Sequence, residues 1–311
     1  AENDTDTSSA KFQSEEAGNV CMTGTEEDIL AQIHTLISVL PANNEDDMSY
    51  DECADDLNRM CEGLENCVGD TALALAMISD DSFYMELKKE YAPSMVTAFI
   101  RLNGATVGCV ANRTESYEEG EKTAEYETGL TARGCEKAAD FVNFCDAFNI
   151  PIVTFEDMPG YLPGVEQEHM GVIRHGAKVL YAYSEATVPK ITVILRKAYG
   201  GGYIAMNSRH LKADFMFAWP TAEIAVMGPE GAANIIFKKE IMAAENPNEM
   251  RKIKVAEYRE KFANPYVAAS KGYIDSVIEP EETRRILKHS IEVSSNKSVL
   301  TPAKKHGIPP F

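Results

Sequence analysis

The spacing of apolar residues along the chain predicts strands that alternate with helices from about residue 95 onward. Apolar runs typical of buried strands occur at residues 96–100, 106–111, 152–155, 188–195, 215–219, 222–226 and 274–278. Helical spacing, or helix-forming composition, occurs at residues 132–149, 169–185, 232–240, 247–262 and 281–293. This alternation indicates an α/β fold. The hairpin-plus-helix order favours a spiral of ββα units over a plain doubly wound sheet, although periodicity alone does not decide between the two.

Two turn signals lie inside this pattern. Asn103-Gly104 separates the first two apolar runs, and this dipeptide between β-rich segments predicts a hairpin. Residues 115–127 hold six carboxylates and one lysine, which predicts an acidic surface loop.

The first 80 residues have a different pattern. Residues 1–25 are polar, and we expect them to be poorly ordered at the start. Apolar residues from Ile29 to Leu40 recur at helical spacing and predict an amphipathic helix that stops at Pro41. An acidic loop and one or two further helices are expected before residue 80. We therefore divide the chain into an acidic N-terminal segment, residues 1–80, and a larger domain, residues 81–311.

Charge and cysteine content narrow the class of protein. The net charge of −19, without a visible basic patch, argues against nucleic acid as a partner. Much of it comes from residues 1–60, where fifteen Asp or Glu face only Lys11 and Arg59, as is usual for a solvated surface. The seven cysteines form no CxxC pair, which fits free thiols in the cytoplasm and argues against a zinc site. We see no signal peptide and no apolar run that could span a bilayer.

A glycine-rich turn is the first candidate for chemistry. Gly200, Gly201 and Gly202 follow an apolar strand and precede a segment of good helix propensity. The first turn of a helix has unpaired N–H donors, and glycine lets a ligand approach the backbone closely. Such a turn suits an oxygen that carries or gains negative charge. The alternative is a tight turn that needs glycine only for its dihedral angles. The pattern is neither GxGxxG nor a P-loop.

A second candidate is the loop that follows the strand at residues 152–155. Glu156 to Gly164 contains Pro159-Gly160 and Pro163-Gly164, which predict two rigid turns. Asp157 is expected to brace this loop rather than to react.

Long stretches of the chain resemble the carboxyltransferase subunit of biotin-dependent acyl-CoA carboxylases and decarboxylases. The nearest types are the propionyl-CoA carboxylase β subunit and the methylmalonyl-CoA decarboxylase α subunit. The resemblance covers roughly residues 80–307. It rests on the segments CDAFNIPIVTFEDMPGYLPGVEQEHMGVIRHGAKVLYAYSEATVPKITVILRKAYGGGYIAM, AWPTAEIAVMGPEGAANIIFKKEI, FANPYVAASKGYIDSVIEPEETRR and KKHG.

The resemblance implies a crotonase-like superhelix of ββα units and a role in carboxyl transfer. In this family the N-terminal half binds the acyl-CoA thioester and the C-terminal half binds carboxybiotin, which a separate protein carries. The backbone N–H groups of Gly201 and Gly202 would then hold the ureido oxygen of biotin. The residues implied to shape the biotin site are Gly160, Tyr161, Leu162, Pro163, Gly164, Tyr199, Gly200 and Tyr203. Relatives often carry Asp at the position of Ile204, near the acyl end of the pocket, and Ala at that of Gly202, so we expect Gly202→Ala to keep most activity.

The segment before residue 80 does not resemble the N-terminal half of the family. We therefore expect half of a split carboxyltransferase that needs an N-half subunit and a biotin carboxyl carrier protein. A biotin carboxylase or a membrane decarboxylase subunit would complete the system. Relatives form trimers or dimers of trimers, so a homo-oligomer is expected.

Two alternatives stay open. The same half could serve a biotin-dependent decarboxylase coupled to a sodium pump, because carboxyl transfer is reversible. It could also be an inactive scaffold of the crotonase fold, although the intact glycine turn speaks against that.

Overall fold

The computed structural model describes residues 6–46, 49–301 and 307–310. A central sheet has the strand order β1-β2-β3-β6-β7-β8-β10, β9 pairs with the end of β7, and β4 and β5 form a separate hairpin. The strands are β1 (Met85–Glu86), β2 (Met95–Leu102), β3 (Ala105–Asn112), β4 (Glu115–Glu118), β5 (Glu121–Glu125), β6 (Ile152–Met158), β7 (Lys190–Tyr199), β8 (Phe215–Ala218), β9 (Glu223–Ala225) and β10 (Ser276–Val277).

The helices are α1 (Ala10–Glu15), α2 (Glu26–Val39), α3 (Thr71–Ile78), α4 (Ala132–Ala147), α5 (Val165–His169), α6 (Val172–Glu185), α7 (Gly200–Ala205), α8 (Pro229–Ile236), α9 (Lys238–Ala243), α10 (Pro247–Phe262), α11 (Pro265–Ser270) and α12 (Thr283–Ser294). Four short 3-10 helices join them, η1 (Leu64–Cys67), η2 (Asp80–Ser82), η3 (Arg209–Leu211) and η4 (Pro280–Glu282).

The hairpin between β2 and β3 forms where the sequence predicts it. Asn103 and Gly104 both have positive φ, 54° and 76°, as a two-residue turn between twisted antiparallel strands requires. Beyond the hairpin, β3, β6, β7, β8 and β10 run parallel. Helices α4, α6 and α7 follow β3, β6 and β7 in chain order, which confirms the α/β fold.

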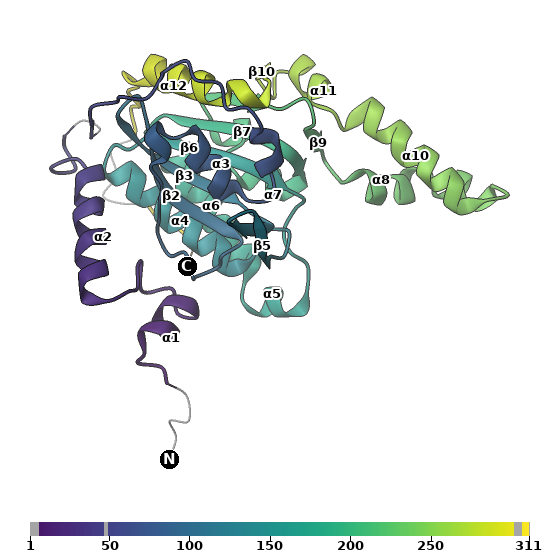
Figure 1. The fold of residues 1–311 in the computed structure, drawn as a ribbon. Helices are drawn as coiled ribbons and strands as arrows, with labels where there is room; N and C mark the ends of the chain where they lie inside the picture. The colour runs from purple at the N-terminus through teal and green to yellow at the C-terminus, as the bar shows by residue number, and fades with distance from the viewer. Residues whose placement is uncertain (1–5, 47–48, 302–306, 311) are drawn as a thin grey trace.

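Helices cover both faces of the sheet (Figure 1). On one face, α4 and α6 pack on Phe99, Val110 and Ile152. On the other, α3 and α12 pack on a layer that includes Val153, Phe155 and Trp219. Residues 61–78 contribute Leu64 and Leu75 to this second layer. The division of the chain at residue 80 stays a prediction.

Several predicted elements have different limits in the structure. The helix expected at residues 169–185 begins only at Val172, because Gly171, with φ of 77°, separates it from α5, which ends at His169. The acidic loop at residues 115–127 forms the hairpin β4–β5, closed by Gly120 with φ of 85°. α1 lies within the segment expected to be poorly ordered, and Ser9 caps it. The residues of KKHG before Gly307 lie outside the described part.

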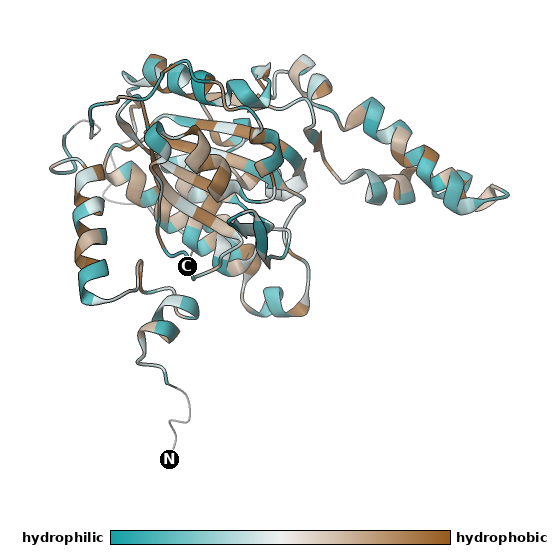
Figure 2. Ribbon diagram, viewed as in Figure 1, coloured by the Kyte–Doolittle hydropathy of each residue, from teal (hydrophilic) through white to brown (hydrophobic). Residues whose placement is uncertain are grey.

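Two segments leave the compact body. α8, α9 and α10 form an arm that projects from one side, and α1 and α2 lie on the opposite side in this view (Figure 1). Hydrophilic and hydrophobic residues both occur along the arm (Figure 2). Ile235, Ile236 and Met242 of this arm are exposed. α2 likewise exposes Leu30 and Ile37. Within the described ranges, no helix has the length and apolar character needed to cross a membrane.

Candidate functional site

The glycines after β7 are the first turn of α7 rather than a loop before it. Tyr199 ends the strand and is the N-cap of the helix. Gly200 has φ of 56°, and a Cβ there would lie 2.9 Å from the Val226 carbonyl oxygen. Glycine at residue 200 is therefore required by the backbone. The N–H groups of Gly201 and Gly202 sit in the first helical turn, where no carbonyl one turn earlier accepts them.

A close backbone contact joins this turn to the loop after β6. A Cβ on Gly202 would lie 2.8 Å from the Gly160 Cα and 2.8 Å from the Met158 Cγ. Because real Cβ atoms do not approach backbone that closely, one of the two segments would have to move. Gly202 does not have positive φ, so its glycine is required by this contact and not by dihedral strain. This crowding argues against the expectation that Gly202→Ala keeps most activity, and the effect of the substitution on the rate stays a prediction.

Tyr161 fills the space beside the contact. Its ring edge lies 3.3 Å from the position of a Cβ on Gly201, and its hydroxyl 2.5 Å from that of a Cβ on Gly176. The ring is thus held between α7 and α6. Burial raises its pKa to about 12, so the hydroxyl stays protonated at neutral pH.

The loop itself is fixed at its first half. Leu130 donates to the Gly160 carbonyl at 2.9 Å and accepts from the Leu162 N–H at 2.9 Å. Gly160 and Gly164 have φ of 138° and 142°, which glycine adopts readily. Pro163 and Gly164 are exposed and lead into α5.

Asp157 braces the end of β6, as expected. Its carboxylate accepts three hydrogen bonds from Arg196, the shortest at 2.6 Å, and one from the Lys197 N–H at 2.8 Å. The Asn112 side-chain amide donates to the Asp157 carbonyl and accepts from the Asp157 N–H. These bonds fix β6 against β3 and β7 just before the Gly160 loop.

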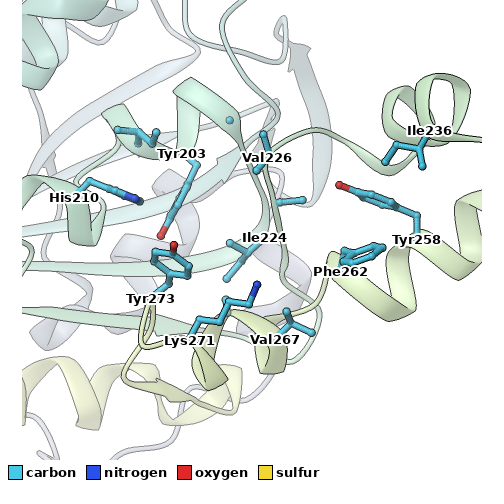
Figure 3. Close-up of a pocket in the computed structure, with 14 residues that line it drawn as sticks. Tyr203, His210, Ile224, Val226, Ile236, Tyr258, Phe262, Val267, Lys271 and Tyr273 are labelled. Atoms are coloured by element: carbon cyan, nitrogen blue, oxygen red, sulfur yellow. The ribbon is translucent and has the colours of Figure 1, made fainter.

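A pocket of about 470 Å³ opens on α7 (Figure 3). The body of the protein and the arm both line it. Its walls are Gly200, Tyr203, Ile204, His210, Ile224, Ala225, Val226, Ile236, Tyr258, Phe262, Val267, Ala268, Lys271 and Tyr273.

The pocket is apolar apart from a few polar tips. Figure 3 shows the Tyr203 and Tyr273 hydroxyls pointing toward one another near His210, and the Lys271 amine lies among the lining residues. The His210 and Tyr273 rings stack with centroids 5.7 Å apart. The Tyr203 side chain is 7% exposed, and its hydroxyl has no hydrogen-bond partner. An apolar cavity with a few convergent polar groups is the usual form of a small-molecule site.

The predicted site residues fall into two groups around α7. Gly160 and Tyr161 contact Gly202 and Gly201 on one side. Gly200, Tyr203 and Ile204 line the pocket. Tyr199 donates from its hydroxyl to Glu223, and its ring faces Gly228. Leu162, Pro163 and Gly164 lie farther along the loop and do not line this pocket.

Sequence reasoning missed the remaining walls of the pocket. His210, Tyr258, Phe262, Lys271 and Tyr273 come from η3, the arm and the segment after α11, and share no local motif. Only the fold brings them to α7. Among the described residues, no group of three or more His, Cys, Asp or Glu gathers in a way that could hold a metal ion.

Comparisons with known proteins place this geometry in a family. A model for the carboxyl transferase domain matches residues 5–309. The chain belongs to the carboxyl transferase domain family.

Its relatives in this carboxyl transferase family include the methylmalonyl-CoA carboxyltransferase 12S subunit of Propionibacterium freudenreichii subsp. shermanii, 49% identical over 94% of this chain and 55% of the relative. The methylmalonyl-CoA decarboxylase subunit alpha of Propionigenium modestum is 46% identical over 90% of this chain and 54% of the relative. The chain thus spans about half the length of the curated relatives it matches.

Solved structures agree with the family assignment. A transcarboxylase 12S crystal structure, described as a hexamer with methylmalonyl-coenzyme A and methylmalonic acid bound, has a TM-score of 0.88 and 47% identity, and the match covers 97% of this chain and 58% of that one. The crotonase-like fold predicted from the sequence is confirmed.

Proposed function

We propose that the chain supplies the carboxybiotin side of a biotin-dependent acyl-CoA carboxyltransferase. The observation that carries this proposal is the glycine turn at the start of α7, the same helix from which Gly200, Tyr203 and Ile204 line the apolar pocket. Membership of the carboxyl transferase family supports the same reaction. The substrates would be acyl-CoA thioesters of the propionyl-CoA, methylmalonyl-CoA or acetyl-CoA class.

The residues present fit a biotin group. Gly201 is exposed, so its backbone N–H in the first turn of α7 is open to a ligand, whereas Gly202 is buried against the Gly160 loop. Apolar walls formed by Ile204, Ile224 and Val226 suit the sulfur-containing ring of biotin. When bound, carboxybiotin supplies the carboxyl group, and negative charge develops on its ureido oxygen.

The chain's own contribution is electrostatic. The N–H groups of Gly201 and Gly202 would donate to the ureido oxygen from fixed positions, and each such donor is worth about 2.7–4 kcal/mol at the transition state. Tyr161 holds the turn against α6. Ile204 makes the acyl end of the pocket apolar, which favours an uncharged acyl chain.

The full reaction needs further components. The acyl-CoA-binding half, on the same polypeptide or on another, would complete the site, and a biotin carboxyl carrier protein would deliver the carboxyl group. The hexamer described for the 12S relative supports an oligomer for this chain. All seven cysteines are free thiols, which supports the reducing cytoplasm as its location.

A specific observation also supports the reverse reaction, decarboxylation of the acyl-CoA. The decarboxylase relative is nearly as similar as the carboxyltransferase relative, 46% against 49% identical. In that case a membrane decarboxylase subunit would replace biotin carboxylase as the partner, while the glycine turn and pocket would act as before.

Reconstitution tests the proposal. These 311 residues are combined with a complementary acyl-CoA-binding half and a carboxybiotinylated carrier, and transfer of labelled carboxyl to propionyl-CoA is measured. We expect transfer in the complete mixture and none when either half is omitted. A complete, assembled mixture that leaves the carboxyl on its carrier would refute the proposed function.

A further inference from the structure

Glu156 on β6 is a buried carboxyl group that the proposed chemistry does not use. Its side chain is fully buried, and neither carboxyl oxygen has a hydrogen-bond partner among the residues that the structure describes. Buried polar groups are almost always paired, because an unpaired one forfeits its hydration without replacement. Such a group in the interior of a sheet therefore requires an explanation.

The position of Glu156 places it beneath α7. It lies in register with Ile194 on the parallel strand β7, so the two side chains share a face of the sheet. Ile194 packs in one cluster with Tyr203. Met158, two residues farther on the same face, meets Gly202. Glu156 thus lies between the sheet and the helix that presents the pocket.

The Tyr203 hydroxyl is a second buried group without a partner in the same region. The hydroxyl of Tyr183, which also approaches Glu156, bonds to Thr154 at 2.9 Å. The Tyr203 side chain lines the pocket and points its hydroxyl into it (Figure 3). Two unpaired polar groups thus lie in the same region of the fold, Glu156 on the strand beneath α7 and Tyr203 at the wall of the pocket, and Glu156 affects the pKa of Tyr203.

Burial favours the uncharged form of both groups. Burial, and to a lesser extent the neighbouring Asp157 charge, raise the pKa of Glu156 well above its usual range. Burial also raises the pKa of Tyr203, with further contributions from Glu156 and Tyr273 and an opposing one from Arg209. A neutral carboxyl group has an O–H to donate, which a carboxylate lacks.

We propose that Glu156 is a positioning residue for Tyr203. Its O–H donates to the Tyr203 hydroxyl oxygen through one water molecule, and the Tyr203 O–H then donates to an oxygen of the ligand in the pocket. The ligand group is a carbonyl or carboxylate oxygen, held by a single directional donor among apolar walls. The identity of the ligand rests on the proposed carboxyl transfer, whereas the contact between Glu156 and Tyr203 does not.

Kinetics of the reconstituted enzyme test the ligand contact. Tyr203→Phe and Glu156→Leu should each raise the KM of one substrate roughly tenfold, about the size of one hydrogen bond, with a smaller change in kcat. Glu156→Gln should recover most of the loss seen with leucine, because its amide still donates. A raised KM for the acyl-CoA assigns the bond to the thioester or its carboxylate, and a raised KM for the biotin carrier assigns it to biotin. Variants that lose only kcat and melting temperature would overturn the ligand contact.

Infrared spectroscopy of the full chain tests the contact with Tyr203 without any activity. Wild-type protein at neutral pH should show the carbonyl stretch of a protonated carboxylic acid, which Glu156→Gln abolishes. Tyr203→Phe should shift this band, and Tyr183→Phe, the matched control, should leave it in place. No acid band, or a band that responds to Tyr183→Phe alone, overturns the proposal. A wild-type enzyme without transfer activity but with the expected band would refute only the proposed function.

Discussion

At the scale of single residues, Gly201 and Gly202 offer a matched pair. A Cβ on Gly202 meets the Gly160 backbone at 2.8 Å, whereas one on Gly201 meets only the edge of the Tyr161 ring at 3.3 Å. Overpacking of this kind costs about 1–3 kcal/mol, and a barrier higher by about 1.4 kcal/mol slows a reaction tenfold. We therefore expect Gly202→Ala to slow carboxyl transfer about tenfold or more, and Gly201→Ala to retain most of the rate.

Transfer rate and melting temperature of both variants check this prediction. Equal rates for the two alanine variants would show that the contact with Gly160 does not position the turn. A Gly202→Ala variant that loses stability while its residual rate per folded molecule is unchanged would assign the glycine to folding alone.

Glu156 should also leave a signature in the stability of the protein. Below the usual pKa of glutamate, folded and unfolded chains both carry the proton. Above it, only the folded chain keeps the proton, because burial raises the pKa of Glu156. Rising pH therefore favours the unfolded chain, by at most about 1.36 kcal/mol per pH unit for this one group, until the pKa of the folded state is reached.

Urea unfolding of wild type and Glu156→Gln between pH 4.5 and 7.5, a range chosen from the usual pKa of about 4.3, measures the effect. The stability of wild type relative to the variant should fall as the pH rises. Glu115→Gln is the control, because hydrogen bonds from Tyr117 and Lys122 lower the pKa of Glu115, so its contribution is already present above the usual pKa and the difference should be nearly constant over this range. A difference for Glu156→Gln that does not change with pH would argue against a neutral Glu156.

At the scale of elements, Arg284 ties α12 to the segment before the sheet. Its buried guanidinium pairs with Asp80 at 2.9 Å and Asp55 at 3.3 Å, and it donates to the Ile78 carbonyl at 2.7 Å. Removing one partner of a buried ion pair costs about 3–5 kcal/mol. We expect Arg284→Met to lower the free energy of unfolding by about that much.

The adjacent arginine is the matched control. Arg285 pairs with Glu282 at the surface, with half of its side chain exposed, and such pairs contribute about 1 kcal/mol or less. Denaturant unfolding measures the free energy of unfolding of Arg284→Met and of Arg285→Met. From the usual values for buried and surface ion pairs, we expect the two to differ by several kcal/mol. Similar unfolding midpoints for the two variants would mean that the ion pairs of Arg284 with Asp55 and Asp80 do not stabilise the fold.

Most elements could be predicted because their signals are local. Asn103-Gly104 set the hairpin, and the apolar run before Tyr199 set β7. Gly171 was not recognised as a helix stop, because its positive φ depends on the backbone geometry between α5 and α6. The glycine turn was found from its composition, but the role of Gly202 depends on Gly160, forty-two residues away in the sequence. The burial of Glu156 could not be predicted from the sequence, because an acidic residue in a strand is ordinarily expected to be exposed.

At the scale of the whole molecule, we expect copies of this chain to associate through the arm of α8, α9 and α10. Ile235 and Met242 are largely exposed on it, and the 12S relative is described as a hexamer. Exposed apolar patches of this kind mark interaction sites. We expect the double substitution Ile235→Ser and Met242→Ser to reduce the average mass in solution.

Light scattering at micromolar concentration measures the mass. Leu300→Ser is the control, because Leu300 is also exposed but lies outside the arm. Wild-type protein that is already a monomer, or a control variant that dissociates as far as the arm variant, would contradict this assignment of the interface.

The walls of the pocket have a consequence for regulation. Tyr203 and Ile224 belong to the body of the protein. Ile236, Tyr258 and Phe262 belong to the arm, so the cavity lies between the body and the arm. Because both parts line the cavity, a contact that fixes the position of the arm relative to the body also fixes the width of the cavity. If neighbouring copies hold the arm, each occupied pocket strengthens their association, and their association tightens the pocket by the same factor. Dilution of the enzyme would then weaken ligand binding, and loss of the ligand would weaken association of the copies.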